Sequence, residues 1–322
     1  MPSSTWPEDP ELGSGFGYKT LSFADDYDGP VTATLVRTEP SLGTSKPAIL
    51  YLHGFIDYFF QKHVARRFNE AEHNFYALDL RKYGRSLNGA THPNICLSFE
   101  EYFEEITRAL EIIVGEGHTS VMLMAHSTGA LPAALYAKDR DKNRFITRII
   151  FNSPFLAMPR SGTGVLAWLG QWLPFWKTDN RINTWYVQSL RKGYKGEWEF
   201  NLAFKPLTGF PAYYGWIRSV VLAQRRIEEG LGLEQPVLVM HSDKSADDKE
   251  WSERLHRADL VLKVDDIKRL GPSLGPGVVM KEIPDGKHDL TLSCRTPREL
   301  CLETMVEWAA IQADYSGGGT QP

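Results

Sequence analysis

The sequence of 322 residues contains few cysteines, no surplus of basic residues and no long apolar run. The three cysteines, Cys96, Cys294 and Cys301, lack metal-ligand spacing and cannot all pair with one another, so we expect reduced thiols and a cytoplasmic protein. The formal net charge of −4, without a basic block, argues against nucleic acid as a partner. Because no apolar run approaches the ~18 residues that span a bilayer, we expect no membrane-spanning segment.

The two ends of the sequence also lack apolar elements. Residues 1–17 have neither the cationic start nor the apolar stretch of a secretory signal. Residues 316–322, SGGGTQP, are predicted to form a disordered tail.

A hydrophobic share of 42% and a charged share of 24% are typical of a globular protein. The length fits one large α/β domain, or a domain with a sizeable insertion.

Short apolar segments alternate with helical patterns along most of the chain. Residues 18–24 and 31–37 are predicted to form an antiparallel hairpin. Residues 48–52, AILYL, are apolar at every position, as expected for a strand buried on both faces of a parallel sheet. The alternation predicts a doubly wound, mostly parallel sheet. Further strands are expected at 74–80, 120–124, 146–151, 236–241 and 278–283, and helices at 64–71, 99–113, after Ser127 and at 297–311.

One region interrupts this alternation. No strand pattern appears between about residues 154 and 233, where six of the nine tryptophans lie. We therefore predict a helical, aromatic-rich cap at 155–233, inserted into a core made of 1–154 and 234–322. The rings either form the cap's own small core or face an apolar ligand. For the second role the candidates are Trp168, Trp172 and Trp176, which lie in a segment with little charge.

A candidate nucleophile follows the apolar run at 121–125. The stretch AHSTG is close to the G-x-S-x-G turn, in which a sharp strand-to-helix bend holds a serine out of the chain path and requires small neighbours. Ala125 replaces the first glycine by a residue with a single methyl group, whereas Gly129 keeps the second position bare. Ser127 is thus either a nucleophile or an ordinary serine at the end of a buried strand.

A serine nucleophile needs a base, an acid and donors for an oxyanion. His288 lies in the loop after the last predicted strand, at the same sheet edge as Ser127. It is the candidate base, and a solvated loop histidine is the alternative. The N–H groups of Phe55 and Thr128 are the candidate oxyanion donors, at the ends of two predicted strands. His53 is expected to make structural hydrogen bonds in its turn.

Several motifs together resemble the α/β-hydrolase superfamily. They are His53-Gly54, LDLRKYGRS at 78–86, AHSTG at 125–129 and the stretch from Gly286 to Asp289. Within the superfamily the chain is similar to the monoacylglycerol lipase and lysophospholipase branch, also called serine aminopeptidase-like hydrolases. The resemblance covers nearly the whole chain and implies an α/β-hydrolase fold with a variable cap. Lys82 and Ala125 stand where the branch usually has glycine.

The acid departs more from the family pattern. The family's aspartate follows a strand in an H-G-x-x-D arrangement, but here HSDKS places Ser245 at that position. Downstream, the segment from Asp259 resembles the family's D-x-V-V stretch. On this interpretation 246–258 is an insertion and Asp259 is the acid. Asp243 and Asp247 are the alternatives, and any of the three is otherwise a solvated turn residue or a helix cap.

The resemblance implies a serine hydrolase that works through an acyl-enzyme on Ser127, with no metal or organic cofactor. We expect a carboxylic ester with an apolar acyl chain, such as a monoacylglycerol or a lysophospholipid, as substrate. The cap is a candidate for transient contact with a lipid surface. Two alternatives stay open. One is an amidase or aminopeptidase with the same triad, and the other is a non-catalytic scaffold that binds an apolar ligand, which the displaced acid would favour.

Overall fold

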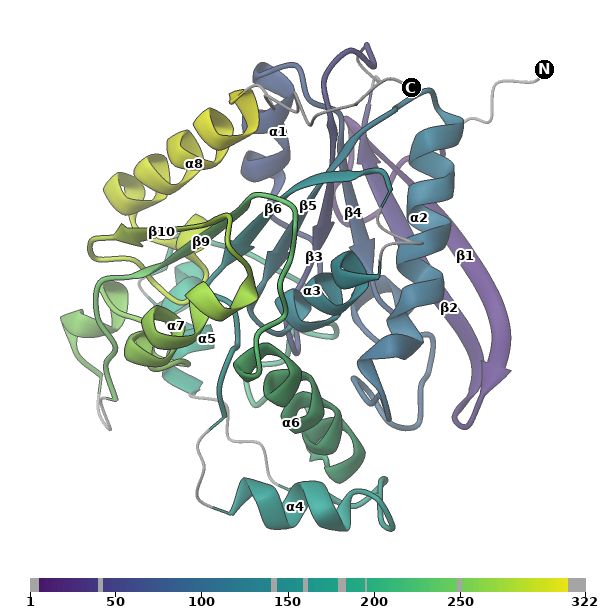
Figure 1. The fold of residues 1–322 in the computed structure, drawn as a ribbon, viewed down its shortest axis with the longest axis vertical. Helices are drawn as coiled ribbons and strands as arrows, with labels where there is room; N and C mark the ends of the chain where they lie inside the picture. Colours follow the sequence, from purple (N-terminus) through teal and green to yellow (C-terminus); the bar gives the residue numbers. More distant parts are fainter. Residues whose placement is uncertain are drawn as a thin grey trace, which may run out of the picture.

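A computed structural model describes residues 6–39, 43–139, 144–158, 162–178, 184–194, 196–247 and 251–311. The predicted tail at 316–322 lies outside these residues. In the described part, an eight-stranded sheet with the order β1-β2-β4-β3-β5-β6-β9-β10 runs through the centre of the molecule (Figure 1). Its strands are β1 (Phe16–Asp26), β2 (Gly29–Thr38), β3 (Ala48–Leu52), β4 (Phe75–Asp79), β5 (Val121–His126), β6 (Ile146–Asn152), β9 (Val237–Ser242) and β10 (Val278–Ile283).

The sheet is mostly parallel. The strands β1 and β2 form the predicted antiparallel hairpin, and β2 also pairs with β4 in antiparallel orientation. From β4 through β3, β5, β6 and β9 to β10 every pairing is parallel. The predicted fold class, a doubly wound and mostly parallel sheet, is therefore confirmed. The helices are α1 (Lys62–Glu70), α2 (Phe103–Gly115), α3 (Ala130–Lys138), α4 (Thr163–Leu169), α5 (Thr184–Leu190), α6 (Tyr214–Glu228), α7 (Val264–Leu270) and α8 (Arg295–Ala310).

The continuous apolar run of β3 is explained by helices on both faces of the sheet. Alternate residues Ala48, Leu50 and Leu52 lie in a core shared with α2, α3 and α6. Ile49 and Tyr51 point to a second core shared with α1 and α8. A strand with period-two side chains and two covered faces has no position at which a polar residue is favoured. Among the described residues, no helix is both long and apolar enough to cross a membrane.

Helix α2 begins with the predicted capping box. Ser98 Oγ accepts a hydrogen bond from Glu100 N, and Glu101 Oε1 accepts one from Ser98 N. These bonds satisfy N–H groups that have no partner within the helix. The first turn, Phe99–Tyr102, is a 3-10 helix, so the predicted single helix is divided there.

The chain between β6 and β9 carries α4, α5 and α6. Helix α4 packs on α6 and α6 packs on α3, so these helices extend the molecule at one end (Figure 1). The sequence showed no strand pattern here, but Lys177–Thr178 (β7) pairs with Ala212–Tyr213 (β8). Strands of two residues are too short to produce an alternating pattern. The division into a core and a separate cap stays a prediction.

A buried arginine joins three segments close to the strand ends. Arg85 donates from Nε and Nη2 to the two carboxylate oxygens of Asp9, at 2.7 and 3.0 Å, and from Nη1 to Asp79 at 2.8 Å. Asp79 also accepts a hydrogen bond from the N–H of Phe59 at 2.9 Å. The N-terminal segment, the end of β4 and the loop after β3 are thereby fixed to one another.

We expect Arg85→Met to lower the free energy of unfolding by about 3–5 kcal/mol, because it leaves two buried carboxylates without their cation. Urea unfolding followed by circular dichroism measures this change. Arg108→Met is the matched control, since Arg108 pairs with Glu111 on the exposed face of α2, and it should cost about 0.5 kcal/mol or less. A loss at Arg85 as small as that at Arg108 would contradict the proposed anchoring.

Candidate active site

Ser127 lies at the turn between β5 and α3. Its φ angle is +53°, a left-handed backbone conformation that residues other than glycine rarely adopt. A short 3-10 turn, Ser127–Gly129, follows and continues into α3. The backbone therefore bends sharply at the carboxyl end of the strand, as the motif predicts, and holds the serine at the sheet edge where ligands bind in open α/β sheets.

The two small positions around Ser127 have different requirements. Ala125 is a buried residue inside β5, paired with Leu52 and Phe151, and strand geometry suits alanine as well as glycine. A Cβ at Gly129 would instead clash with the carbonyl oxygen of His53. The missing first glycine is thus compatible with the turn, whereas the second glycine is required by a close backbone approach.

His288 lies between the predicted nucleophile and the predicted acid. Its Nε2 is 2.9 Å from Ser127 Oγ, and its Nδ1 is 2.9 Å from Asp259 Oδ2. All three side chains are buried. The structure thus brings together the serine, histidine and aspartate that the sequence selected from three distant segments.

Asp259 reaches this position through the loop after β9. It forms a parallel bridge with Ser245, the residue at the family's usual acid position, through Asp259 N to Lys244 O and Ala246 N to Asp259 O. The chain between them leaves this point and returns beside it, as an insertion would. Asp259 Oδ1 accepts hydrogen bonds from the N–H groups of Val261 and Leu262, both at 2.8 Å, which leaves Oδ2 for His288.

The two alternative acids lie elsewhere. Asp243 accepts hydrogen bonds from Asp285 N at 2.9 Å and from Lys244 Nζ at 3.1 Å. Asp247 is exposed. Among the described residues, no hydrogen bond joins either of them to His288.

The segments that carry the predicted oxyanion donors lie beside Ser127. A Cβ at Gly54 would lie 3.0 Å from Cβ of Ser127, so the loop that contains Phe55 passes directly beside the serine. Thr128 is in the first turn after β5, where N–H groups lack intrahelical partners. His53 has the structural role expected of it, because its Nε2 accepts from Leu80 N at 3.0 Å and its Nδ1 donates to Gly54 O at 2.8 Å. That Phe55 and Thr128 bind an oxyanion stays a prediction.

A buried carboxylate next to His288 was not recognised from the sequence. Asp289 accepts hydrogen bonds from Asn152 Nδ2, from Thr291 N and Oγ1, and from Gln61 Nε2, at 2.7–3.1 Å. Burial alone would raise the pKa of Asp289, but the neighbouring His126 and these donors lower it below its ordinary value. Its position directly after His288 was the one available signal, since its partners come from distant segments.

A second cluster surrounds Asp289. Ligand-type atoms of Asp57, His126 and Asp289 lie within 4.8 Å of one another, as in a metal site. Lys205 Nζ, however, is 2.6 Å from Asp57 Oδ1 and provides a positive charge there. We therefore assign no metal ligands among these residues.

The chain between β6 and β9, in which the cap is predicted and which is called the inserted segment below, contacts the loop that carries His288. Asp289 N donates to Tyr186 Oη at 3.2 Å, and the Tyr186 ring packs against the His288 ring. Lys287 Nζ donates to Ser189 O at 2.8 Å, and burial lowers the pKa of Lys287 to about 8. Trp198 Nε1 donates to the carbonyl oxygen of Leu292 at 2.9 Å. No sequence pattern indicated these contacts, because they join positions about a hundred residues apart.

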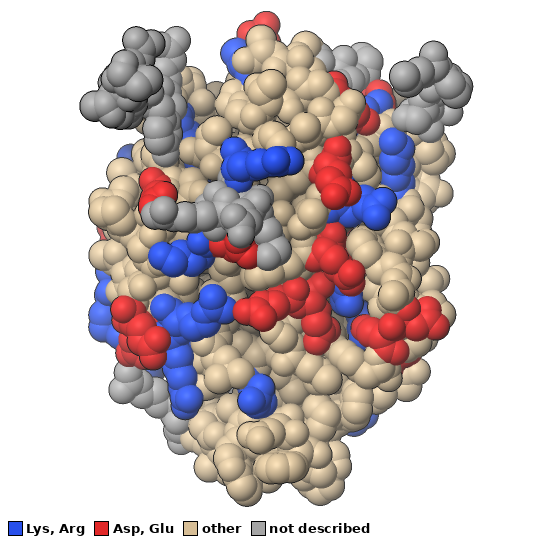
Figure 2. All heavy atoms as spheres, turned by 45° about the vertical axis from the view of Figure 1, so that its right-hand side comes forward, with Lys and Arg blue, Asp and Glu red and all other residues tan. Residues whose placement is uncertain are grey.

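The three predicted ligand-binding tryptophans lie on the surface. Trp168, Trp172 and Trp176 are 63%, 67% and 60% exposed. They belong to α4 and the turns after it, at the end of the molecule drawn lowest in Figure 1. On the face drawn in Figure 2, this lower end carries few charged side chains. Their role in binding stays a prediction.

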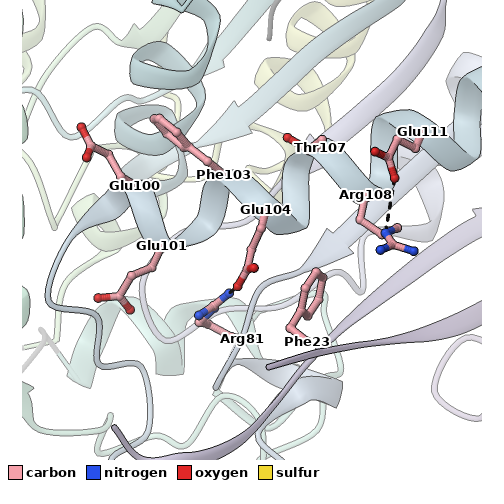
Figure 3. A pocket seen from close by; sticks show the side chains of 9 residues that line it. All are labelled: Phe23, Arg81, Glu100, Glu101, Phe103, Glu104, Thr107, Arg108 and Glu111. Atoms are coloured by element: carbon pink, nitrogen blue, oxygen red, sulfur yellow. Dashed lines mark hydrogen bonds and ion pairs between the residues drawn. The ribbon is translucent and has the colours of Figure 1, made fainter. Parts of the chain in front are cut away.

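A groove of about 650 Å³ lies along α2 (Figure 3). Acidic side chains gather on the face of the molecule drawn in Figure 2. Within the groove, Arg81 pairs with Glu104 and Arg108 pairs with Glu111. Glu100 pairs with Arg226, whereas Glu101 accepts hydrogen bonds from Tyr27 and from backbone N–H groups. None of the predicted site residues lines the groove. The lining residues are Phe23, Arg81, Glu100, Glu101, Phe103, Glu104, Thr107, Arg108 and Glu111.

We expect Asp289→Asn to lower the free energy of unfolding by about 1–3 kcal/mol near pH 6, since the amide keeps only one of the two oxygens that accept hydrogen bonds from buried donors. A carboxyl group whose pKa is lower in the folded chain stabilises the fold above its unfolded pKa, and this stabilisation disappears as the pH falls through the folded value. The difference between wild type and variant should therefore shrink below about pH 4. Urea unfolding at several pH values measures it, with the exposed Asp247→Asn as control. A difference independent of pH would contradict the assignment.

Comparisons with known proteins identify the family of the chain and its fold. Residues 43–261 match the hydrolase family described as serine aminopeptidase, S33. A search of curated proteins finds no significant match.

Several solved structures have a fold similar to that of this chain. A monoacylglycerol lipase from Paleococcus ferrophilus is 18% identical with a TM-score of 0.63, over 91% of this chain and 98% of that one. A soluble variant of monoglyceride lipase from Saccharomyces cerevisiae, solved with a substrate analogue, is 14% identical with a TM-score of 0.67, over 96% and 98%. A carboxyl esterase from Bacillus coagulans, solved with glycerol, is 15% identical with a TM-score of 0.61, over 90% and 97%.

At these identities the structural likeness establishes the shared fold. The family match spans about two thirds of the chain, and the resemblance noted in the sequence motifs is confirmed. The chain therefore belongs to the serine aminopeptidase S33 family of α/β-hydrolases.

Proposed function

We propose that this protein is a serine hydrolase that cleaves carboxylic esters with an apolar acyl chain, of the monoacylglycerol or lysophospholipid type. The observation that carries the proposal is the pair of 2.9 Å contacts from Ser127 to His288 and from His288 to Asp259. A hydroxyl, an imidazole and a carboxylate in this order form a nucleophile, a base and the group that orients the base.

In the first half of the reaction, Ser127 Oγ attacks the ester carbonyl carbon while its proton passes to His288 Nε2. Asp259 accepts the Nδ1–H of His288, which fixes the tautomer and stabilises the imidazolium. The negative charge that develops on the carbonyl oxygen is bound by the N–H groups of Phe55 and Thr128. The imidazolium then returns the proton to the departing alkoxide, which leaves as an alcohol.

In the second half, water attacks the acyl-enzyme. His288 takes a proton from the water, and a second tetrahedral oxyanion forms at the same donors. Collapse of this intermediate breaks the bond to Ser127 Oγ, which recovers its proton from His288. The product is a carboxylic acid, and no cofactor takes part in these steps.

The choice of an ester with an apolar chain rests on the inserted segment and on the proteins of similar fold. Two of those proteins are a monoacylglycerol lipase and a monoglyceride lipase. The three exposed tryptophans form an apolar surface suited to the interface of a lipid layer, where the indole ring is favoured. The three free cysteines support the cytoplasm as the proposed compartment.

Labelling by a fluorophosphonate, together with hydrolysis of p-nitrophenyl octanoate, tests the proposed triad. We expect Ser127→Ala to abolish both, because the nucleophile is lost. Asp259→Asn should lower kcat by about 10⁴-fold, since His288 then loses the acceptor that sets its tautomer. Asp243→Asn is the matched control and should stay within twofold of wild type.

Three results would contradict this proposal. The first is turnover by Ser127→Ala, and the second is a loss of kcat in Asp243→Asn as large as that in Asp259→Asn. The third is a series of p-nitrophenyl esters of increasing acyl-chain length in which the acetate is hydrolysed fastest. Faster turnover of an aminoacyl-naphthylamide than of any ester would instead favour an amidase.

We expect Trp172→Ser to slow hydrolysis of a long-chain monoacylglycerol presented in phospholipid vesicles, by roughly tenfold, through weaker surface contact. Turnover of dissolved p-nitrophenyl butyrate should not change, because Trp172 is exposed and outside the triad. Val279→Ser, at an exposed position of β10, is the control. Equal losses on both substrates would contradict a role at the lipid surface.

A further inference from the structure

Lys205 buries its ammonium group beside the candidate site, although it belongs to the inserted segment. Its side chain is 5% exposed, and Nζ lies 2.6 Å from Oδ1 of Asp57, which is 3% exposed. The rings of Phe60 and Phe200 lie 5.5 and 5.8 Å from the same nitrogen. Burying two charges costs free energy that an isolated ion pair rarely returns in full. Stability alone is therefore a poor explanation for this pair.

The pair lies where three parts of the candidate site meet. Asp57 is in the loop of the candidate oxyanion donor, His126 precedes the nucleophile and Asp289 follows the base. Ligand-type atoms of these three side chains lie within 4.8 Å of one another. Any repulsion or displacement within this cluster would thus move the segments that carry the reaction.

Two carboxylates in such a cluster repel each other unless a cation lies near. His126 does not provide it at neutral pH, because burial lowers its pKa by more than Asp289 and Asp57 raise it, and His288 and Lys205 lower it further. Burial raises the pKa of Asp289, whereas His126, the hydrogen-bond donors and, with a smaller effect, Lys205 lower it below its ordinary value. Among the described residues, the other titratable groups that interact with this cluster are Tyr51, His53, His63, Tyr186, His288 and Cys301.

We propose that Lys205 is a positioning residue for the reaction, whose buried ammonium neutralises Asp57 beside Asp289 and so keeps the oxyanion loop, the nucleophile turn and the base loop aligned. This inference rests on the proposed serine hydrolase function. Lys205 does not touch the reacting atoms and acts through the charge that it places among the flanking residues.

The test is a double-mutant cycle, in which wild type is compared with Lys205→Met, Asp57→Asn and the variant that carries both substitutions. Lys205→Met leaves an unpaired carboxylate near the base, which favours the imidazolium, so the acidic limb of the kcat/KM–pH profile should move to higher pH by about one unit. Asp57→Asn leaves an unpaired ammonium and should move the limb to lower pH. The double variant removes both charges and should restore the limb and most of kcat. Each single variant should lower kcat by roughly tenfold at unchanged KM.

Lys268→Met is the matched control, since Lys268 Nζ lies 2.6 Å from Glu282 in an exposed pair. It should leave both kcat and the acidic limb unchanged. If Lys205→Met does not fold, Asp57→Asn and the double variant still carry the test. The inference is overturned if the single variants lose rate without opposite displacements of the limb, or if the double variant stays as slow as the single variants.

Two readouts separate this inference from the proposed function. The pH dependence is measured for hydrolysis of p-nitrophenyl butyrate and for the rate of fluorophosphonate labelling. Wild type that neither hydrolyses nor labels contradicts the proposed function and with it this inference. Wild type that labels normally, beside variants whose limbs do not move, overturns the inference alone.

Discussion

Three carboxylates, those of Asp57, Asp259 and Asp289, are buried at one edge of the sheet, and the arrangement of this edge depends on how each is compensated. Asp259 receives two backbone N–H groups and faces His288. Asp289 is surrounded by donors from distant loops, and Asp57 is paired with a lysine of the inserted segment. A buried carboxylate without such partners would be too costly to keep. Compensation of charge therefore joins segments that apolar packing alone would leave loosely aligned.

The strands and the turn at Ser127 could be predicted because their signals are local. The run at 48–52 is apolar throughout since each face of β3 is covered, and the turn at Ser127 needs small neighbours within two residues. The place of Asp259 could be predicted for a similar reason, because the segment that begins there resembles the family's pattern. In the structure Asp259 forms a bridge to Ser245, so its carboxylate reaches His288 from beside the position at which the family's acid is expected.

The contacts of Tyr186, Ser189 and Lys205 could not be predicted in the same way. These three residues lie in a region without strand periodicity, and each forms a hydrogen bond with a residue about a hundred or more positions away in sequence. From sequence alone, a single lysine or tyrosine in such a region is expected to be exposed to solvent. Their burial is a property of the tertiary structure, where the inserted segment packs against the loops that hold the candidate site.

The inserted segment therefore has an inner and an outer half, which differ in how many amino-acid substitutions they can tolerate. The inner half, around α5 and Lys205, is bound to the loop of His288 by hydrogen bonds and to Asp57 by an ion pair. The outer half, around α4 and its tryptophans, faces outward from the body. On the proposed function, substitutions in the outer half would change the surface that meets a lipid substrate without moving the loop that holds His288. Recognition and chemistry would then change through substitutions in different parts of one chain segment.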